Sequence, residues 1–121
     1  MRDHTKLKAF QLADQLVLKI YKATKGFPSE EKFGLTVQMR SAALSISSNI
    51  VEGCARNTEK DYLRFLDIAH GSARELEYQI SLAKRLGFIN SNLENDLEKK
   101  SIEVSKVING LIKSLRYSAK K

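Results

Sequence analysis

The stretch Ser41-Ala42-Ala43-Leu44-Ser45-Ile46-Ser47-Ser48-Asn49-Ile50-Val51 decides the fold of this chain, because it contains no charge. The chain is 29% charged overall, so a helix exposed on most sides should carry about three charges in such a window. On a helical wheel, this stretch and its flanks form two apolar stripes on nearly opposite sides. The inner stripe comprises Leu35, Met39, Ala42, Ile46, Ile50 and Gly53, and the outer stripe comprises Phe33, Val37, Leu44 and Val51. A helix that is apolar on two faces is buried on two faces, which predicts that the outer stripe contacts another copy of the molecule.

The composition indicates one all-helical domain. The 121 residues are enough for one hydrophobic core, so a single domain over 1–121 is predicted. One cysteine and two histidines are too few for a disulfide framework or a Cys/His zinc site, so no metal or cofactor is expected. The amino terminus lacks the apolar segment of a signal peptide, and no stretch reaches the roughly 18 apolar residues of a membrane span. We therefore expect a soluble cytoplasmic protein without membrane association.

Apolar periodicity and capping signals predict four helices joined by short turns. Ser29 is the expected N-cap of the second helix. Capping-box spacing marks Thr58 with Asp61 and Ser91 with Glu94 at the next two helix starts. The predicted helices cover about 6–25, 30–55, 59–86 and 92–117. Long helices with short connections pack as antiparallel neighbours, which predicts an up-down four-helix bundle.

The net charge of +7 is unevenly distributed, with +4 in residues 1–28, −3 in 29–98 and +6 in 99–121. The predicted topology brings the chain start, the second turn and the chain end to one end of the bundle. The basic residues there are Arg2, Lys6, Lys8, Arg56, Lys60, Arg64, Lys113, Arg116, Lys120 and Lys121. Such an end would contact RNA phosphates without reading sequence. The candidates for phosphate contact are Arg56, Lys60, Arg64, Lys113 and Arg116, although a purely solubilising charge is an equal alternative.

Four polar residues near the uncharged stretch are interpreted as structural. Asn49 lies on the flank of the inner stripe, and Glu52 ends the uncharged stretch. Arg40 lies on the outer stripe, within the expected subunit interface, and the hairpin register places it level with Glu75. This predicts an Arg40–Glu75 ion pair, within one subunit or across a subunit boundary. The alternative is an arginine that binds a phosphate with two hydrogen bonds.

The sequence offers little to support catalysis. Cys54 has no evident base partner, because His70 lies further along the hairpin. The Glu-x-x-His spacing of helical di-iron sites and Gly-rich phosphate loops are both absent from the sequence. Ser45, Ser47 and Ser48 are better explained as small residues that hydrogen-bond to helix carbonyls. A non-enzymatic protein is therefore expected.

Two sequence blocks resemble a known family. The first is Phe33-Gly34-Leu35 followed by Gln38-x-Arg40-x-Ala42-x-x-x-Ile46-x-x-Asn49-Ile50-x-Glu52-Gly53-x-x-Arg56. The second is Phe65-Leu66-x-Ile68-Ala69-x-Gly71-Ser72-x-x-Glu75-Leu76. Both are similar to the four-helix-bundle proteins encoded within 23S rRNA intervening sequences, often named S23 ribosomal protein. Ser41 departs from the family pattern, in which a second arginine is common after Arg40.

The resemblance implies a four-helix bundle that assembles as a homopentameric barrel and is associated with rRNA. A related branch, the accessory variability determinant of diversity-generating retroelements, partners a reverse transcriptase and binds nucleic acid. Three hypotheses for function follow. The first is a homo-oligomer that binds structured RNA through its basic end. The second is an adaptor that docks a protein such as a reverse transcriptase without contacting nucleic acid, and the third is a structural oligomer whose charge serves solubility alone.

Overall fold

The computed structural model describes residues 2–119 and contains four α-helices and two short 3₁₀ segments, with no strand in that range. The helices are α1 (Lys8–Thr24), α2 (Leu35–Cys54), α3 (Glu59–Arg85) and α4 (Ser91–Ala119), and the 3₁₀ segments are η1 (His4–Lys6) and η2 (Ser29–Glu31). The predicted all-helical class with four helices is confirmed. None of the described helices is both long and apolar enough to cross a membrane.

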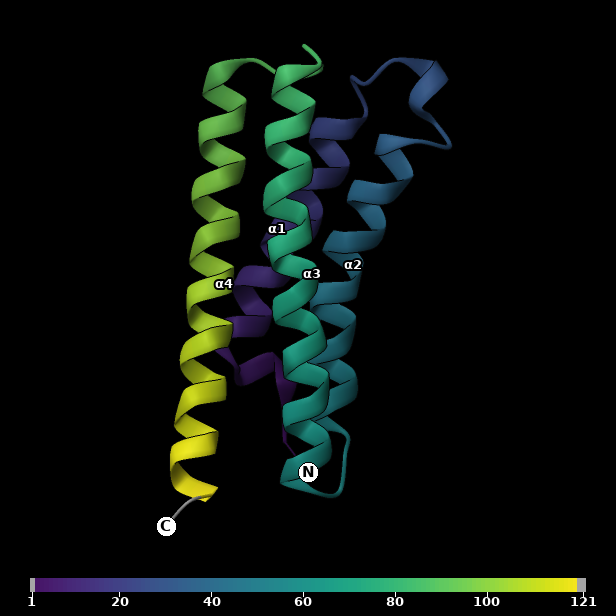
Figure 1. Ribbon diagram of the computed structural model, residues 1–121. Helices are drawn as coiled ribbons and strands as arrows, with labels where there is room; N and C mark the ends of the chain where they lie inside the picture. Colours follow the sequence, from purple (N-terminus) through teal and green to yellow (C-terminus); the bar gives the residue numbers. More distant parts are fainter. Residues whose placement is uncertain (1, 120–121) are drawn as a thin grey trace.

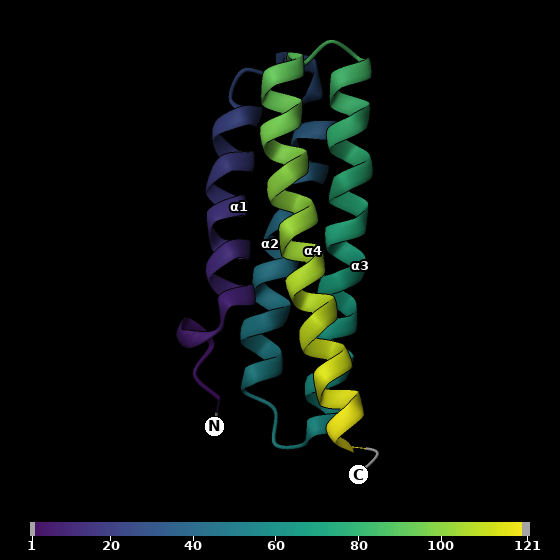
Figure 2. The same cartoon turned by 90° about the vertical axis from the view of Figure 1, so that its left-hand side faces the viewer.

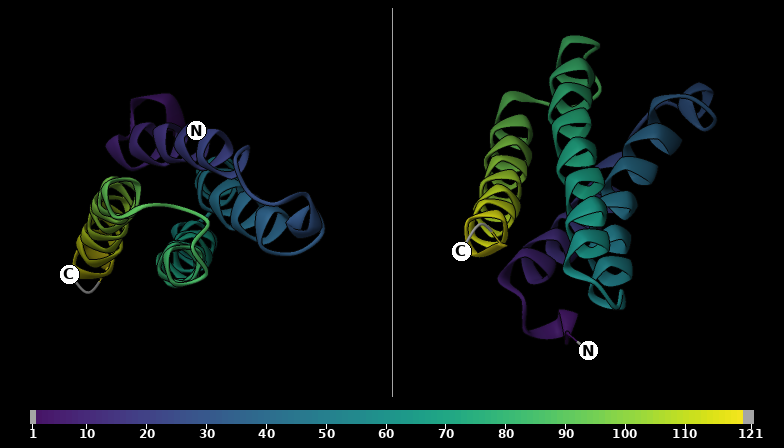
Figure 3. Two further views of the ribbon diagram at one scale, coloured as in Figure 1. Left: turned by 90° about the horizontal axis from the view of Figure 1, so that it is seen from above. Right: turned by 60° about the horizontal axis from the view of Figure 1, so that its bottom comes forward.

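The four helices surround one core (Figure 1). Figure 2 shows α1 and α3 on opposite sides of the bundle with α4 in front of α2, and the view from above in Figure 3 shows the same arrangement. The α2–α3 turn lies at the same end as the first and last described residues. The α1–α2 and α3–α4 connections lie at the opposite end. The most extensive helix contact joins α2 to α3.

The inner stripe of α2 is buried as predicted, and Met39, Ile46 and Ile50 are fully enclosed. Each of the other helices adds fully buried apolar side chains, among them Leu16, Ile20, Leu66, Leu76, Ile80, Leu97, Val104 and Ile108. Burial of each such side chain stabilises the fold by roughly 1.5–3 kcal/mol. The core thus follows from the helical periodicity of the sequence.

The predicted start of the second helix near residue 30, with Ser29 as its N-cap, is wrong. Ser29–Glu31 forms η2, and α2 begins only at Leu35, after Gly34 in a non-helical conformation (φ −110°, ψ −119°). The backbone N–H of Leu35 donates to Glu31 Oε1 at 3.0 Å, which satisfies one free amide of the new helix. The glutamate predicted to lie in the first helical turn therefore acts from outside the helix.

Local caps define the other helix ends. Thr58 Oγ1 accepts from the backbone N–H of Asp61 at 3.1 Å, as its spacing predicted. At the start of α4, Asn90 Oδ1 instead accepts from the backbone N–H of Leu93 at 2.8 Å, so Asn90 takes the capping role that was predicted for Ser91. Both residues are good caps, and the sequence pattern alone did not distinguish them.

Candidate nucleic-acid interface

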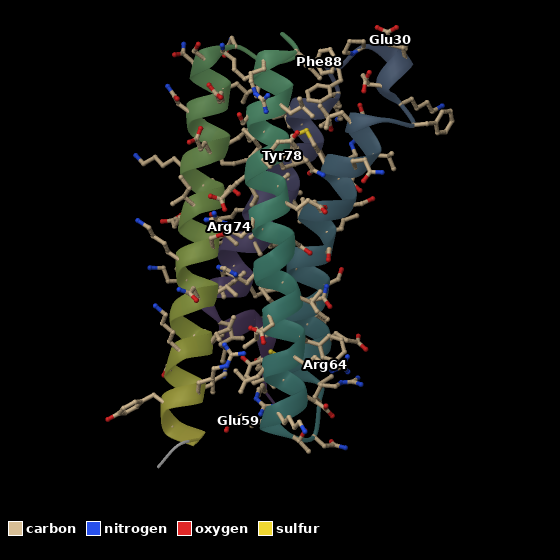
Figure 4. All side chains as sticks on the ribbon, in the orientation of Figure 1. Glu30, Glu59, Arg64, Arg74, Tyr78 and Phe88 are labelled. Atoms are coloured by element: carbon tan, nitrogen blue, oxygen red, sulfur yellow. The ribbon has the colours of Figure 1, made fainter. Side chains whose placement is uncertain are left out.

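The five cations predicted to contact phosphate lie at one end of the bundle. Lys60 and Arg64 are in the first turns of α3, Lys113 and Arg116 are in the last turns of α4, and Arg56 lies in the α2–α3 turn. Figure 4 shows Glu59 and Arg64 at this end, far from Phe88 and Glu30. Lys120 and Lys121, which were also expected here, lie outside the described residues. We refer to this region as the basic end.

A cavity of about 560 Å³ lies between the start of α3 and the end of α4. It brings together Lys60, Arg64 and Arg116, whereas Lys113 is not among its lining residues. Acidic side chains line the same cavity, and Arg116 Nη2 lies 2.6 Å from Asp67 Oδ2. Both side chains of this ion pair are about half exposed, so it contributes only ~0–1 kcal/mol to stability. Asp67 therefore holds Arg116 only weakly.

Phe65 holds two of the predicted arginines together. The Arg64 guanidinium lies 4.7 Å from the centroid of the Phe65 ring, and the Arg56 guanidinium lies 5.5 Å from it. Arg56 is also anchored to Glu52, through a 3.2 Å bond to its carbonyl and a 3.3 Å ion pair to its carboxylate. Phe65 follows the helical spacing of the buried residues of α3, but its side chain is only half-buried. In the sequence, the adjacency of Arg64 and Phe65 is the feature that could have indicated this arginine–ring contact.

The first residues of the chain fold across the α2–α3 turn. Arg2 Nη1 donates to the carbonyl of Arg56 at 3.1 Å, and its guanidinium lies 4.1 Å from the centroid of the Tyr62 ring. Asp3 accepts from the backbone N–H and hydroxyl of Thr5 at 3.0 and 2.6 Å, and these hydrogen bonds lower the pKa of its carboxyl. The chain start thereby brings another guanidinium to the basic end.

Cys54 and Tyr62 are buried beneath Arg2. Burial raises the pKa of the Cys54 thiol. The pKa of Tyr62 is raised to about 12, mainly by burial and secondarily by the neighbouring Cys54. Because the thiolate is the reactive form of cysteine, this environment disfavours Cys54 as a nucleophile.

The predicted Arg40–Glu75 ion pair within one subunit is wrong. Arg40 turns toward α1, where its Nε donates to the hydroxyl of the buried Thr24 at 2.8 Å and its guanidinium lies 4.6 Å from the Tyr21 ring centroid. Glu75 is exposed on α3. The hairpin register placed the two residues at the same height, but they lie on different sides of their helices.

The remaining predicted structural polar residues are anchored locally. Asn49 Nδ2 donates to the Ser45 carbonyl at 2.7 Å and to its hydroxyl at 3.0 Å, and that hydroxyl lies 2.8 Å from the Ser72 hydroxyl on α3. Ser47 donates to the Leu44 carbonyl at 3.2 Å, as expected for a serine within a helix. Glu52 acts through Arg56, as described above. These bonds satisfy polar groups where α2 meets α3.

The outer stripe of α2 is largely open to solvent. Phe33, which precedes α2, is 86% exposed, Val37 and Leu44 are about 40% exposed, and Val51 is half-buried. Helix α3 adds two exposed apolar side chains, Ile68 and Leu86, on the side of α3 whose Ser72 contacts Ser45 of α2. We refer to these six residues together as the α2–α3 face.

The sequence model of the 23S rRNA-intervening sequence protein family matches residues 5–110. The chain belongs to this family. A crystal structure from Bacteroides thetaiotaomicron VPI-5482, described as a protein with unknown function from the S23 ribosomal protein family, has a similar fold. Its TM-score is 0.81 at 25% sequence identity, and the match covers 87% of this chain and 95% of the Bacteroides chain. No curated protein matches the sequence.

In this member of the 23S rRNA-intervening sequence protein family, the residues that carry the family resemblance organise the α2–α3 hairpin. An added Cβ at Gly53 would lie 3.0 Å from Phe65 Cβ and 3.1 Å from Tyr62 Cδ1, so glycine permits the close approach of the two helices. This approach places Phe65 beside Arg56. The motif therefore builds the scaffold of the basic end.

Proposed function

We propose that this protein is a cytoplasmic, non-enzymatic homo-oligomer that binds structured RNA through its basic end. In this proposal each subunit is an antiparallel up-down four-helix bundle, and five subunits form the assembly. The family's description links its members to 23S rRNA intervening sequences, which makes rRNA the first RNA to test.

One observation carries the RNA proposal. Within the described side chains, Lys60, Arg64 and Lys113 have no acidic partner within ion-pair distance, although they lie at the same end as Arg56 and Arg116. Unpaired cations attract counterions, and phosphates that replace those counterions bind with a gain in entropy. The buried thiol of Cys54 supports the non-enzymatic part of the proposal.

The experiment is a titration of rRNA fragments against the protein at several salt concentrations. The logarithm of the affinity should fall linearly with the logarithm of salt, with a slope of about −0.7 to −0.9 per phosphate contacted. Reversing Arg56, Lys60 and Arg64 to glutamate should weaken binding and leave the assembly intact. No binding at about 50 mM salt, where phosphate contacts are strong, contradicts the proposal.

A matched control separates the basic end from net charge. Reversing the exposed Lys22, Lys25 and Lys99 to glutamate also lowers the formal net charge from +7 to +1, but these residues lie outside the basic end. We expect this variant to retain most of the affinity. Equal losses in the two variants would indicate attraction by overall charge.

The α2–α3 face supports the oligomer. Apolar side chains gathered on one face of a small domain mark a contact surface, and the serine-rich stretch beside them allows close approach. The same face favours the second candidate function, an adaptor that docks a different protein. Sedimentation of the wild-type protein distinguishes the two, because a monomer would contradict self-assembly and leave the face for another partner.

A further inference from the structure

Guanidinium–aromatic pairs are concentrated at the basic end. Within the described residues, three of the five arginine–ring pairs lie there, namely Arg2 over Tyr62, Arg56 over Phe65 and Arg64 over Phe65. The other two lie elsewhere on the bundle. The basic end therefore combines charge with planar groups.

The Phe65 cluster, composed of Arg56, Phe65 and Arg64, is the accessible part of this arrangement. Tyr62 is only 3% exposed beneath Arg2, and Arg2 is also tied to the Arg56 carbonyl at 3.1 Å. Arg64 is exposed and has no ion-pair partner among the described side chains, and Figure 4 shows it beside α3 at the basic end. Arg56 is restrained by Glu52 and by Phe65. The cluster thus presents two planar guanidinium groups beside one aromatic ring.

Such planes suit an unpaired nucleobase. A guanidinium that packs one face on an aromatic ring can offer its other face to a base, and proteins bind splayed-out RNA bases by stacking them on aromatic rings and arginine planes. Bases within an A-form duplex are stacked on one another, and the deep major groove excludes side chains. Lys60 and Arg116 line a cavity that Arg64 also lines, so both cations share one surface with the Phe65 cluster.

We propose that the Phe65 cluster binds an unpaired base of single-stranded RNA, with Lys60 and Arg116 contacting the flanking phosphates. This inference rests on the proposed RNA-binding function and names the RNA element that the basic end takes. In a bound loop or bulge, the cluster would stack with the exposed base regardless of its sequence, because every base has a π face.

The test compares a single-stranded RNA with a duplex that contains the same strand. A purely electrostatic surface should favour the duplex, because its charge density is higher. The proposal predicts tighter binding of the single strand. The key variant is Arg64→Lys, which retains the charge and loses the plane. It should weaken single-strand binding by roughly tenfold, in the range seen for loss of one stacked base, and leave the salt dependence unchanged.

The matched control is Arg85→Lys, because Arg85 lies 5.8 Å from the Tyr78 ring centroid, near the opposite end of α3. This variant should bind as the wild type does. Phe65→Leu should also weaken single-strand binding, and circular dichroism checks whether this variant is folded. Because Arg64→Lys is a surface change, it tests the cluster even when Phe65→Leu unfolds.

Two failures can be told apart. If the wild type binds neither RNA, both the proposed function and this inference are wrong. If the wild type prefers the duplex, or Arg64→Lys binds the single strand as the wild type does, the stacking inference is overturned and RNA binding by charge stands.

Discussion

Replacing Gly53 with alanine tests whether the close approach of α2 and α3 builds the basic end. The new methyl group would lie 3.0 Å from Phe65 Cβ, 3.1 Å from Tyr62 Cδ1 and 3.4 Å from the Tyr62 carbonyl oxygen. The first of these atoms is attached directly to the α3 backbone, and the second belongs to a buried ring. Neither can move without displacing α3, so the contact must be relieved by separating the helices.

The expected magnitude is the difference between two opposing effects. Alanine is favoured over glycine within a helix by about 0.5–1 kcal/mol. Overpacking a tight site costs about 1–3 kcal/mol. We therefore expect Gly53→Ala to lower the free energy of unfolding by about 1 kcal/mol, because the cost of overpacking exceeds the gain in helix propensity.

Gly110→Ala is the matched control, since Gly110 lies within α4 and an added Cβ there meets no atom within 4 Å. It should raise the free energy of unfolding by about 0.5–1 kcal/mol. The two variants should thus differ by about 2 kcal/mol, or roughly 8 °C in Tm for a domain of this size.

The assay is thermal and urea unfolding followed by circular dichroism, with all proteins at one concentration because assembly also affects Tm. Binding of single-stranded RNA by Gly53→Ala should weaken as well, since the change displaces Phe65. The reasoning is refuted if Gly53→Ala is stabilised to the same extent as Gly110→Ala.

Three further predictions concern the α2–α3 face, the Arg40 contact and the buried tyrosine. Leu44→Glu should dissociate the proposed oligomer in sedimentation, because it places a charge in the contact. Leu18→Glu, on the exposed surface of α1, should leave the oligomer intact. Equal behaviour of the two variants would exclude the α2–α3 face as the subunit contact. Arg40→Ala should lower the free energy of unfolding by about 1–2 kcal/mol through loss of the Thr24 and Tyr21 contacts, whereas Glu75→Gln should change it by less than about 0.5 kcal/mol; a comparable loss in both would restore the ion pair. Since the pKa of Tyr62 is raised from 10.0 to about 12 in the folded state, its contribution to stability is present below pH 10 and lost as pH rises toward 12. The free energy of unfolding, measured across that pH interval, should therefore decline less steeply for Tyr62→Phe than for the wild type.

Features that depend on one helix at a time were predictable from the sequence. The inner stripe of α2 from Leu35 to Gly53 is buried as the periodicity indicated, and Thr58 caps α3 as its spacing indicated. Both depend on the fixed geometry of a single helix, in which side chains three and four residues apart share a face. The start of α2 was harder to place, because Glu30 and Glu31 fit a helix start equally well inside η2.

Features that depend on how helices are rotated and inclined relative to one another required the tertiary structure. The register of the α2–α3 hairpin gave the height of Arg40 along the bundle, but its direction toward Thr24 on α1 depends on where α1 packs. The cluster at Phe65 likewise forms because Gly53 lets α2 approach α3 closely enough for two arginines from different segments to reach one ring.

By itself, the sequence determined that the uncharged stretch from Ser41 to Val51 would form a helix with one face in the core and a second apolar face. It also indicated that cations from three distant segments would share one end. Only the tertiary structure decided that Ile68 and Leu86 extend the second face, and that Arg56 and Arg64 meet on Phe65. The reason is physical: periodicity records the burial of each face within one helix, whereas contacts between side chains depend on the rotation and separation of neighbouring helices.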